Sequence, residues 1–337
     1  MRILIVDDSA LIRSILKGIL ATEERMTVVA EGTNGMQALT LNRNLEPDLI
    51  IMDIQMPVMD GLAATRRIMA EKPTPILIFS NELDAGTGYE ALNSGAVEVI
   101  RKPDMDQFNE PAFQEGFFRR IRAAAASKVL PKPNPQEGSA ESVSGGRGFK
   151  LLVIGASTGG PLAVKAVLQH LPANFPLGIA LVQHMEAGFD QGYARWLNDF
   201  TPLTVRLAGT EEPVRPGVVC IAPVDHHLIV RGDRLVLNEG PKVLNQKPSV
   251  DMLFSSAAES YGDRLIGVLL TGMGKDGADG CAAIVSRQGV TLVQDEASSA
   301  IFGMPKAAIE RGAATRILPL DEIPEHLFRL AGVKHIV

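Results

Sequence analysis

A serine in a glycine-rich segment is the residue of this chain whose setting most favours covalent chemistry. The segment GASTGG at residues 155–160 follows the apolar run LLVI at residues 151–154, as in a strand that turns into a helix. Glycine permits so tight a turn that the hydroxyl of Ser157 stands exposed, with room beside it for a substrate. The pattern also fits a plain β-α turn in which Ser157 only caps the next helix, so the motif alone leaves both interpretations open.

A nucleophilic serine needs a base and a carboxylate that orients it. His184 is the best placed base, because it follows the apolar run at residues 179–183 and should lie at the same sheet edge as Ser157. Asp276 follows another apolar run, at residues 265–270, and is the candidate acid. In α/β-hydrolases the acid precedes the histidine, so this order argues against that fold. The remaining histidines are His170, His226, His227, His326 and His335.

The glycines around Asp276 also permit a dinucleotide-binding interpretation. Gly272, Gly274 and Gly277 match the GxGxxG fingerprint after a strand, and Asp295 lies near the position that binds a ribose. Against this, Asp276 would lie in the phosphate-binding turn, where a carboxylate repels pyrophosphate. Equilibrium dialysis with a labelled nicotinamide cofactor distinguishes the two interpretations.

Carboxylates at strand ends indicate a second site in the first third of the chain. Asp7 and Asp8 follow the apolar run at residues 3–6, and Asp53 follows the run at residues 49–52. Ser80 follows the run at residues 76–79, and Lys102 comes just after the one at residues 97–100. The carboxyl ends of strands in an open α/β sheet converge on one crevice, so these side chains should meet. Repulsion among the carboxylates then requires a cation, and hard oxygen ligands beside one lysine point to Mg²⁺.

The elements that position these residues alternate along the chain. Short apolar runs alternate with longer helical stretches, which is typical of a parallel sheet with helices on both faces. We therefore predict an α/β protein with two doubly wound, mostly parallel sheets. The expected strands cover residues 3–6, 27–30, 49–52, 76–79, 97–100, 151–154, 179–183, 218–222, 265–271 and 290–294, with a hairpin over residues 227–237.

A stretch rich in proline, glycine and serine separates the two sets of elements. It runs from the end of an expected helix near Ala123 to Gly148, and its composition is that of a solvated linker. We expect an N-terminal domain over residues 1–122, a linker over residues 123–148 and a C-terminal domain over residues 149–337.

Composition narrows the class of protein. A chain of 337 residues, 46% of them hydrophobic, is long enough for two domains, and a net charge of -6 argues against nucleic-acid binding. Cys220 and Cys281 adjoin apolar residues and are expected to be reduced core thiols, as in a cytoplasmic protein. No apolar run approaches the roughly 18 residues that span a bilayer, and Asp7 comes too early for a signal peptide, so we expect no membrane insertion.

Residues 1–122 resemble a response-regulator receiver domain. The resemblance rests on the aspartates, on the segment MPVMDG at residues 56–61 after Asp53, and on Ser80 and Lys102. It implies a flavodoxin-like fold and phosphoryl transfer from the histidine kinase of a chemosensory array to Asp53. It also implies ligands for Mg²⁺ and a switch that contacts the phosphoryl group: Asp8, Asp53, the backbone carbonyl of Gln55 and, through its water shell, Asp7 for the ion, and Ser80 and Lys102 for the switch. Val99 stands where receivers often carry an aromatic residue that couples phosphorylation to the output face.

Nearly the whole chain resembles the chemotaxis protein-glutamate methylesterases of the CheB family. The matching segments are GASTGG at 155–160, QHM at 183–185, IAP at 221–223, PSVD at 248–251, TGMGKDG at 271–277 and FGMP at 302–305. The resemblance implies a Rossmann-like methylesterase domain with a Ser157, His184 and Asp276 triad and no cofactor. Backbone N–H groups of Thr158 and Met273 are the candidates for the oxyanion hole.

The implied reaction is hydrolysis of glutamyl methyl esters on the cytoplasmic helices of chemoreceptors to glutamate and methanol, and some family members also deamidate receptor glutamines. In the family, the unphosphorylated receiver covers the esterase cleft, and phosphorylation, here at Asp53, relieves the block. A binding module that sequesters receptor or kinase remains the alternative from another class. Retained signalling output after Ser157→Ala would favour that module over the enzyme.

Overall fold

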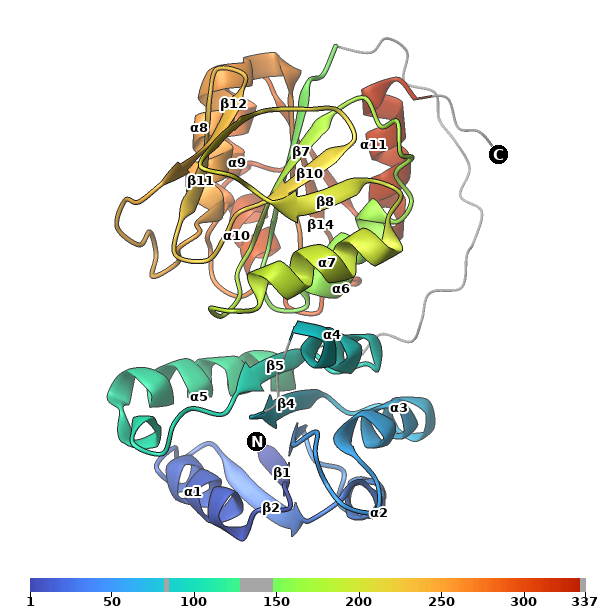
Figure 1. Ribbon diagram of the computed structural model, residues 1–337, viewed down its shortest axis with the longest axis vertical. Coiled ribbons are helices and arrows are strands. Elements are labelled where there is room, and N and C mark those ends of the chain that lie inside the picture. The colour runs from blue at the N-terminus through green and yellow to red at the C-terminus, as the bar shows by residue number, and fades with distance from the viewer. Residues whose placement is uncertain (82–84, 128–147, 334–337) are drawn as a thin grey trace. The chain divides into compact units, whose positions relative to one another are not determined.

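The computed structural model describes residues 1–81, 85–127 and 148–333, and the chain divides into two compact units, one within residues 1–129 and one within residues 130–337. Each unit has its own parallel sheet, which confirms the predicted α/β class with two domains (Figure 1). Most of the predicted linker, residues 128–147, lies outside the described residues, and its first residues still belong to a helix that ends at Ala126. The exact domain boundaries therefore stay a prediction.

The N-terminal unit contains a five-stranded sheet of order β2-β1-β3-β4-β5, which confirms the flavodoxin-like expectation. The three inner strands β1, β3 and β4 are almost entirely apolar, because helices cover both faces of a parallel sheet. The elements are β1 Arg2–Val6, α1 Ala10–Ala21, β2 Thr27–Gly32, α2 Gly35–Leu45, β3 Leu49–Met52, α3 Gly61–Glu71, β4 Ile76–Ser80, α4 Ala85–Asn93, β5 Glu98–Arg101, η1 Gln107–Asn109 and α5 Pro111–Ala126.

Strand pairing in this unit explains why its acidic residues meet. Strands β1 and β3 run parallel, with Val6 opposite Met52, so the residues that follow them, Asp7 and Asp53, leave neighbouring strands at the same edge. Strand β4 lies beside β3, and β5 lies beside β4 and ends just before Lys102. The aspartates and the lysine thus come from one end of the sheet.

The C-terminal unit contains a seven-stranded parallel sheet of order β15-β14-β13-β6-β7-β10-β8 and a three-stranded antiparallel sheet of order β11-β12-β9. Figure 1 shows helices α8 and α9 on one side of the large sheet and α6, α7 and α11 on the other. The elements are β6 Leu151–Ala156, α6 Gly160–Leu168, β7 Gly178–Gln183, α7 Asp190–Phe200, β8 Thr204–Leu207, β9 Glu211–Pro213, β10 Val218–Ile221, β11 His227–Arg231, β12 Arg234–Asn238, α8 Val250–Tyr261, η2 Gly262–Arg264, β13 Leu265–Leu269, α9 Ala278–Ser286, β14 Val290–Gln294, α10 Met304–Glu310, β15 Arg316–Leu318, η3 Leu320–Glu322 and α11 Ile323–Ala331.

The strand order of the large sheet reverses at β6. Strands β7 and β10 continue the sheet to one side of β6, and β13 and β14 continue it to the other. Gly155 pairs with Leu269 of β13, and Ala156 pairs with Gln183 of β7, so three carboxyl ends lie side by side. Such a reversal opens a crevice at the carboxyl edge of an α/β sheet, and ligands bind there.

All of the expected strands and the expected hairpin are present, with some different ends. The expected strand over residues 265–271 stops at Leu269, and the expected strand over residues 218–222 stops at Ile221. Three strands were not expected, namely β8, β9 and β15. They have three or four residues each, too few for a clear apolar periodicity, and they pair at the margins of the sheets.

Two expectations from composition also have structural counterparts. Cys220 and Cys281 are buried free thiols, and burial raises the pKa of Cys220 to about 12, so it stays protonated. Within the described ranges, no helix is long and apolar enough to cross a bilayer.

Close packing of helices α8 and α9 makes a stability prediction possible. A Cβ atom added to Gly280 would lie 2.4 Å from the Cβ of Phe254, whereas one added to Gly18 in α1 would meet nothing within 4 Å. We expect Gly280→Ala to lower the free energy of unfolding by about 2 kcal/mol, because the helices must separate. Gly18→Ala should raise it by up to about 1 kcal/mol through helix propensity. Urea unfolding of both variants measures the difference, and two changes of the same sign would contradict the packing argument.

Candidate functional site

Ser157 lies in the tight turn between β6 and α6, at the point where the strand order reverses. Its backbone N–H donates to the carbonyl of Thr271 at 3.0 Å, which ties the turn to the loop after β13. The Nε2 of Gln183 donates to the carbonyl of Ser157 at 2.8 Å, which ties the turn to the end of β7. The half-buried serine is therefore held between the two loops that carry the other candidate residues.

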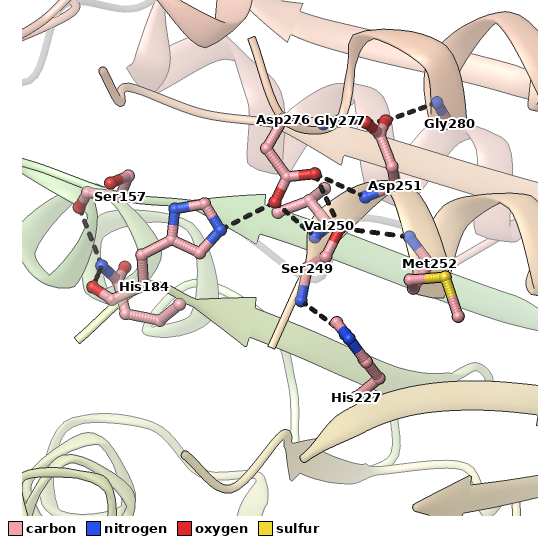
Figure 2. Close-up of polar contacts among 11 residues, drawn as sticks. Ser157, His184, His227, Ser249, Val250, Asp251, Met252, Asp276, Gly277 and Gly280 are labelled. Atoms are coloured by element: carbon pink, nitrogen blue, oxygen red, sulfur yellow. Dashed lines mark hydrogen bonds and ion pairs between the residues drawn. The ribbon is translucent and has the colours of Figure 1, made fainter. Parts of the chain in front are cut away.

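His184 and Asp276 form a direct contact in this site. The Nε2 of His184 lies 2.8 Å from the Oδ2 of Asp276, and both side chains are almost fully buried. The backbone N–H of His184 donates to the carbonyl of Ala156 at 3.0 Å, so the backbone of His184 lies beside the turn that carries Ser157. Figure 2 shows the imidazole between Ser157 on one side and Asp276 on the other.

The contact with Asp276 determines which nitrogen of His184 can act as a base. Because Nε2 faces a carboxylate oxygen, it carries the proton, and Nδ1 keeps its lone pair. That Nδ1 is buried and has no hydrogen-bond partner among the described residues. No hydrogen bond joins it to Ser157 in the described structure, although catalytic hydrogen bonds often form only when substrate is bound. The three predicted residues therefore lie together, and of the two contacts expected in a triad the described structure has the one between His184 and Asp276.

The carboxylate of Asp276 accepts hydrogen bonds on both oxygens. Besides His184, its donors are the hydroxyl of Ser249 at 2.8 Å and the backbone N–H groups of Val250 at 2.8 Å and Asp251 at 3.0 Å. Burial raises the pKa of Asp276, but the hydrogen bond and charge interaction with His184 and the backbone donors outweigh it and hold the pKa below the ordinary value. The group stays ionised at neutral pH and can stabilise an imidazolium.

Thr158 and Met273 have backbone N–H groups free for a ligand. Neither N–H has a protein acceptor in the described part of the chain. The Met273 loop also packs tightly against the serine, since a Cβ added to Gly272 would lie 2.7 Å from the Cβ of Ser157. The turn that carries Thr158 and the loop that carries Met273 therefore pack against each other, and both N–H groups stay candidates for the oxyanion hole.

Asp276 is surrounded by residues that were not predicted to be functional. Ser249 and Asp251 belong to the segment PSVD, which carried part of the family resemblance, and His227 was expected only to open a hairpin. His227 is buried and accepts the N–H of Ser249 on Nδ1 at 3.1 Å. Its Nε2 donates to the carbonyl of Pro241 at 2.9 Å. The only sequence signal for this group was the motif itself.

The other histidines form no hydrogen bond with Ser157 or Asp276 in the described structure. His226 and His326 each contact a nearby backbone carbonyl through Nδ1, and His170 contacts the side chain of Gln169. His335 lies outside the described residues.

The dinucleotide interpretation conflicts with the structure around α9. A pyrophosphate would need free N–H groups at the N-terminus of that helix. The N–H groups of Gly277 and Gly280 instead donate to the Oδ1 of Asp251, at 2.9 and 2.7 Å. The position is already taken by a carboxylate of the protein.

The acidic residues of the N-terminal unit form the predicted cluster. Oxygen atoms of Asp7, Asp8 and Asp53 all lie within 4.8 Å of one another. The Nζ of Lys102 lies 2.7 Å from an oxygen of Asp7 and 2.7 Å from an oxygen of Asp53. Burial raises the pKa of Asp7, and the hydrogen bond and charge of Lys102 offset this only in part. Three converging carboxylates with incomplete compensation fit a hard divalent cation.

The remaining predicted residues of this unit lie around that cluster. Ser80 ends β4 and is buried, and its carbonyl accepts the backbone N–H of Lys102 at 3.0 Å. Gln55 lies exposed in the loop after Asp53, and Val99 is buried in β5. The two switch residues therefore come from adjacent strands, since Ser80 ends β4 and Lys102 directly follows β5.

Comparisons with known proteins match both units of the chain to known families. The family of the CheB methylesterase matches residues 152–327, and the response regulator receiver domain matches residues 3–111. A protein-glutamate methylesterase/protein-glutamine glutaminase 2 of Anaeromyxobacter dehalogenans is 42% identical, over 98% of this chain and 96% of its own. A protein-glutamate methylesterase/protein-glutamine glutaminase of Archaeoglobus fulgidus is 39% identical, over 99% of each chain. The crystal structure of the CheB methylesterase catalytic domain of Thermotoga maritima, 41% identical, matches with a TM-score of 0.52 over 54% of this chain and 98% of that one.

Lys102 provides a test of the acidic cluster. We expect Lys102→Met to lower the free energy of unfolding by about 3 kcal/mol at pH 8, because two buried carboxylates lose their cation. The pKa of Asp7 is already raised and rises further in the variant, so the folded state takes up a proton as the pH falls. The deficit should therefore be smaller at pH 5, as measured by denaturant unfolding at both pH values.

Lys17→Met is the matched control, because Lys17 pairs with Glu31 at 2.6 Å but its side chain is 51% exposed. It should cost less than about 1 kcal/mol. A Lys102→Met deficit that is equal at both pH values would contradict the proposed balance of charge.

Proposed function

The chain belongs to the CheB methylesterase family, and on this premise we propose that it acts in the cytoplasm as a phosphorylation-regulated serine esterase on chemoreceptors. As a member, the chain is a protein-glutamate methylesterase, and the shared name of its relatives adds protein-glutamine glutaminase activity. The proposed substrates are glutamyl methyl esters on the cytoplasmic helices of chemoreceptors. Their hydrolysis would yield glutamate and methanol, and a receptor glutamine would yield glutamate and ammonia.

The proposal rests on one arrangement. His184 lies between Ser157 and an ionised Asp276, and its buried Nδ1 has no hydrogen-bond partner within the described part of the chain (Figure 2). A structural histidine of this kind would be expected to use both nitrogens in hydrogen bonds, as His227 does. Here one nitrogen is fixed by a carboxylate and the other is left for a proton. That is the division of labour that a general base needs.

In the proposed first step, the hydroxyl of Ser157 gives its proton to Nδ1 of His184 while its oxygen bonds to the ester carbonyl carbon. The carbonyl electron pair moves onto oxygen, where the N–H groups of Thr158 and Met273 would stabilise it, at roughly 10² to 10³ in rate per donor. The imidazolium stays bonded to Asp276 through Nε2. When the carbonyl re-forms, the bond to the methoxy oxygen breaks, and that oxygen takes the proton from Nδ1 and leaves as methanol.

In the second step, water attacks the glutamyl ester of Ser157. Nδ1 of His184 removes a proton from the water as its oxygen bonds to the carbonyl carbon, and then returns the proton to the oxygen of Ser157 as the acyl bond breaks. The products are the receptor glutamate and the free serine.

The N-terminal unit would control this activity through Asp53. Its carboxylate would attack the phosphorus of a phosphohistidine on the kinase, so that an O–P bond forms as the N–P bond breaks. Asp7, Asp8, Asp53 and the carbonyl of Gln55 would hold Mg²⁺, which when bound offsets the charge of the transferring group. Lys102, now shared by Asp7 and Asp53, would turn to the phosphoryl oxygens, and Ser80 beside it would follow. Phosphorylation would thereby shift a population from a blocked to an open esterase.

The serine is tested by Ser157→Ala. We expect methanol release from methylated receptors to fall by at least about 10³-fold, because the proposed acyl bond forms on the serine oxygen. Ser256→Ala, which removes a hydroxyl from α8 away from the site, should retain activity. Undiminished release by Ser157→Ala would exclude the serine mechanism. Loss of release with unchanged signalling output would favour a binding module instead.

The regulation is tested by Asp53→Asn. We expect a small-molecule phosphodonor with Mg²⁺ to stimulate methanol release by the unaltered protein but not by this variant, because the acceptor carboxylate is gone. Asp106→Asn changes an exposed acid of the same unit, at the N-cap of η1, whose side chain makes no capping hydrogen bond, and this variant should respond normally. Stimulation that survives Asp53→Asn would overturn the proposed control.

A further inference from the structure

Helices α8 and α9 cap each other's N-termini with carboxylates. The first backbone N–H groups of any helix lack acceptors within that helix. At α8 the acceptor is Asp276, which precedes α9, and at α9 the acceptor is Asp251, which lies in the first turn of α8 (Figure 2). We call this pair of caps the exchange. Asp276 is the acid of the proposed triad, so the exchange fixes the position of its carboxylate.

The α8 side of the exchange holds both oxygens of Asp276. The N–H groups of Val250 and Asp251 donate to different oxygens, at 2.8 and 3.0 Å, and the positive end of the helix dipole favours the ionised form. The hydroxyl of Ser249 adds a third donor at 2.8 Å. These donors leave Oδ2 facing His184, and the carboxylate has little freedom to turn away.

Ser249 is itself fixed from two directions. It is fully buried at the N-cap of α8, where its hydroxyl accepts the N–H of Met252. Its own N–H donates to Nδ1 of His227, whose other nitrogen is held by the carbonyl of Pro241. Its single hydroxyl proton is therefore directed at Asp276.

The α9 side of the exchange buries a second negative charge behind the first. Gly277, the N-cap of α9, has no side chain to cap the helix, and Asp251 does so through Oδ1. Burial raises the pKa of Asp251 to about 6, backbone bonds from α9 oppose this, and the charge of Asp276 adds to it. The carboxyl is thus mostly ionised at pH 8.

The titratable groups around Asp251 and Asp276 come from several elements. Helix α9 contributes Asp279 and the buried thiol of Cys281, both of which interact electrostatically with Asp251. Strand β11 contributes His227, which contacts Ser249, and the loop after β7 contributes His184, which contacts Asp276. His184 is therefore the nearest group of this set that gains a positive charge during the proposed reaction.

We propose that Ser249 and Asp251 are positioning residues of the esterase: Ser249 fixes the carboxylate of Asp276 toward His184, and the buried charge of Asp251 stabilises the imidazolium. The inference rests on the proposed function and deepens it. Neither residue touches the substrate, and each acts through Asp276. An apolar residue at either position would leave buried donors without an acceptor or a carboxylate without a donor.

The charge of Asp251 is tested by Asp251→Asn, which keeps an oxygen acceptor for α9. We expect the acidic limb of the pH profile of kcat/KM to move to lower pH, by on the order of half a pH unit, because the imidazolium loses a buried negative neighbour. Asp279→Asn removes a charge from the same helix end, but this side chain is 60% exposed and paired with Arg311. Its shift should be much smaller because of solvent screening.

The hydroxyl of Ser249 is tested by Ser249→Ala, with Ser256→Ala as the matched control in the same helix. We expect kcat for methanol release to fall about tenfold with little change in KM, because one charge-assisted hydrogen bond to the acid is lost. The pH at which the acidic limb falls does not depend on the fraction of the sample that is folded. For the kcat comparison, urea unfolding measures that fraction.

The outcomes separate this inference from the function beneath it. If the unaltered protein shows no methanol release that depends on Ser157, the proposed function fails. If it does, and Asp251→Asn leaves the limb in place, the charge role is wrong. If Ser249→Ala matches Ser256→Ala in kcat, the positioning role of the serine is wrong, and this second variant decides that part even if Asp251→Asn does not fold.

Discussion

The buried carboxylate of Asp276 is the group on which the C-terminal site depends. A buried negative charge is costly unless donors and opposite charge surround it. Here the start of helix α8, the hydroxyl of Ser249 and the imidazole of His184 all meet that need. Because these donors come from separate segments, satisfying the carboxylate also sets how α8, the β7 loop and the β13 loop come together. The same side chain thus serves the packing of this unit and the proposed catalysis.

The N-terminal unit also buries negative charge, and it compensates that charge in a different way. Its carboxylates also follow parallel strands, but Asp7 and Asp53 share a single lysine instead of a helix terminus. The ammonium of Lys102 stands at the end of a flexible side chain, whereas the N–H groups that donate to Asp276 are fixed in the backbone of α8. A flexible cation suits the switch proposed for this unit, and fixed backbone dipoles suit the proposed acid of the triad, which must keep its orientation.

Much of the fold and of the site could be predicted from the sequence because its signals are local. Apolar runs located the strands, and the polar residues that end them located Ser157, His184, Asp276 and the acidic cluster. The strands that were missed, such as Glu211–Pro213, have too few residues to show a period. His227 was missed as a partner of Ser249, since the two residues lie 22 positions apart in the chain.

By itself, the sequence determined that two α/β units would form and which residues would stand at the ends of their strands, because periodicity and turn residues act over short stretches of chain. Only the tertiary structure decided that the PSVD segment begins a helix against Asp276, that Asp251 returns the cap to α9, and that Nδ1 of His184 is the nitrogen left free. These features rest on hydrogen bonds between residues far apart in the chain. A buried donor takes whichever acceptor the packing brings to it, and no local pattern encodes that choice.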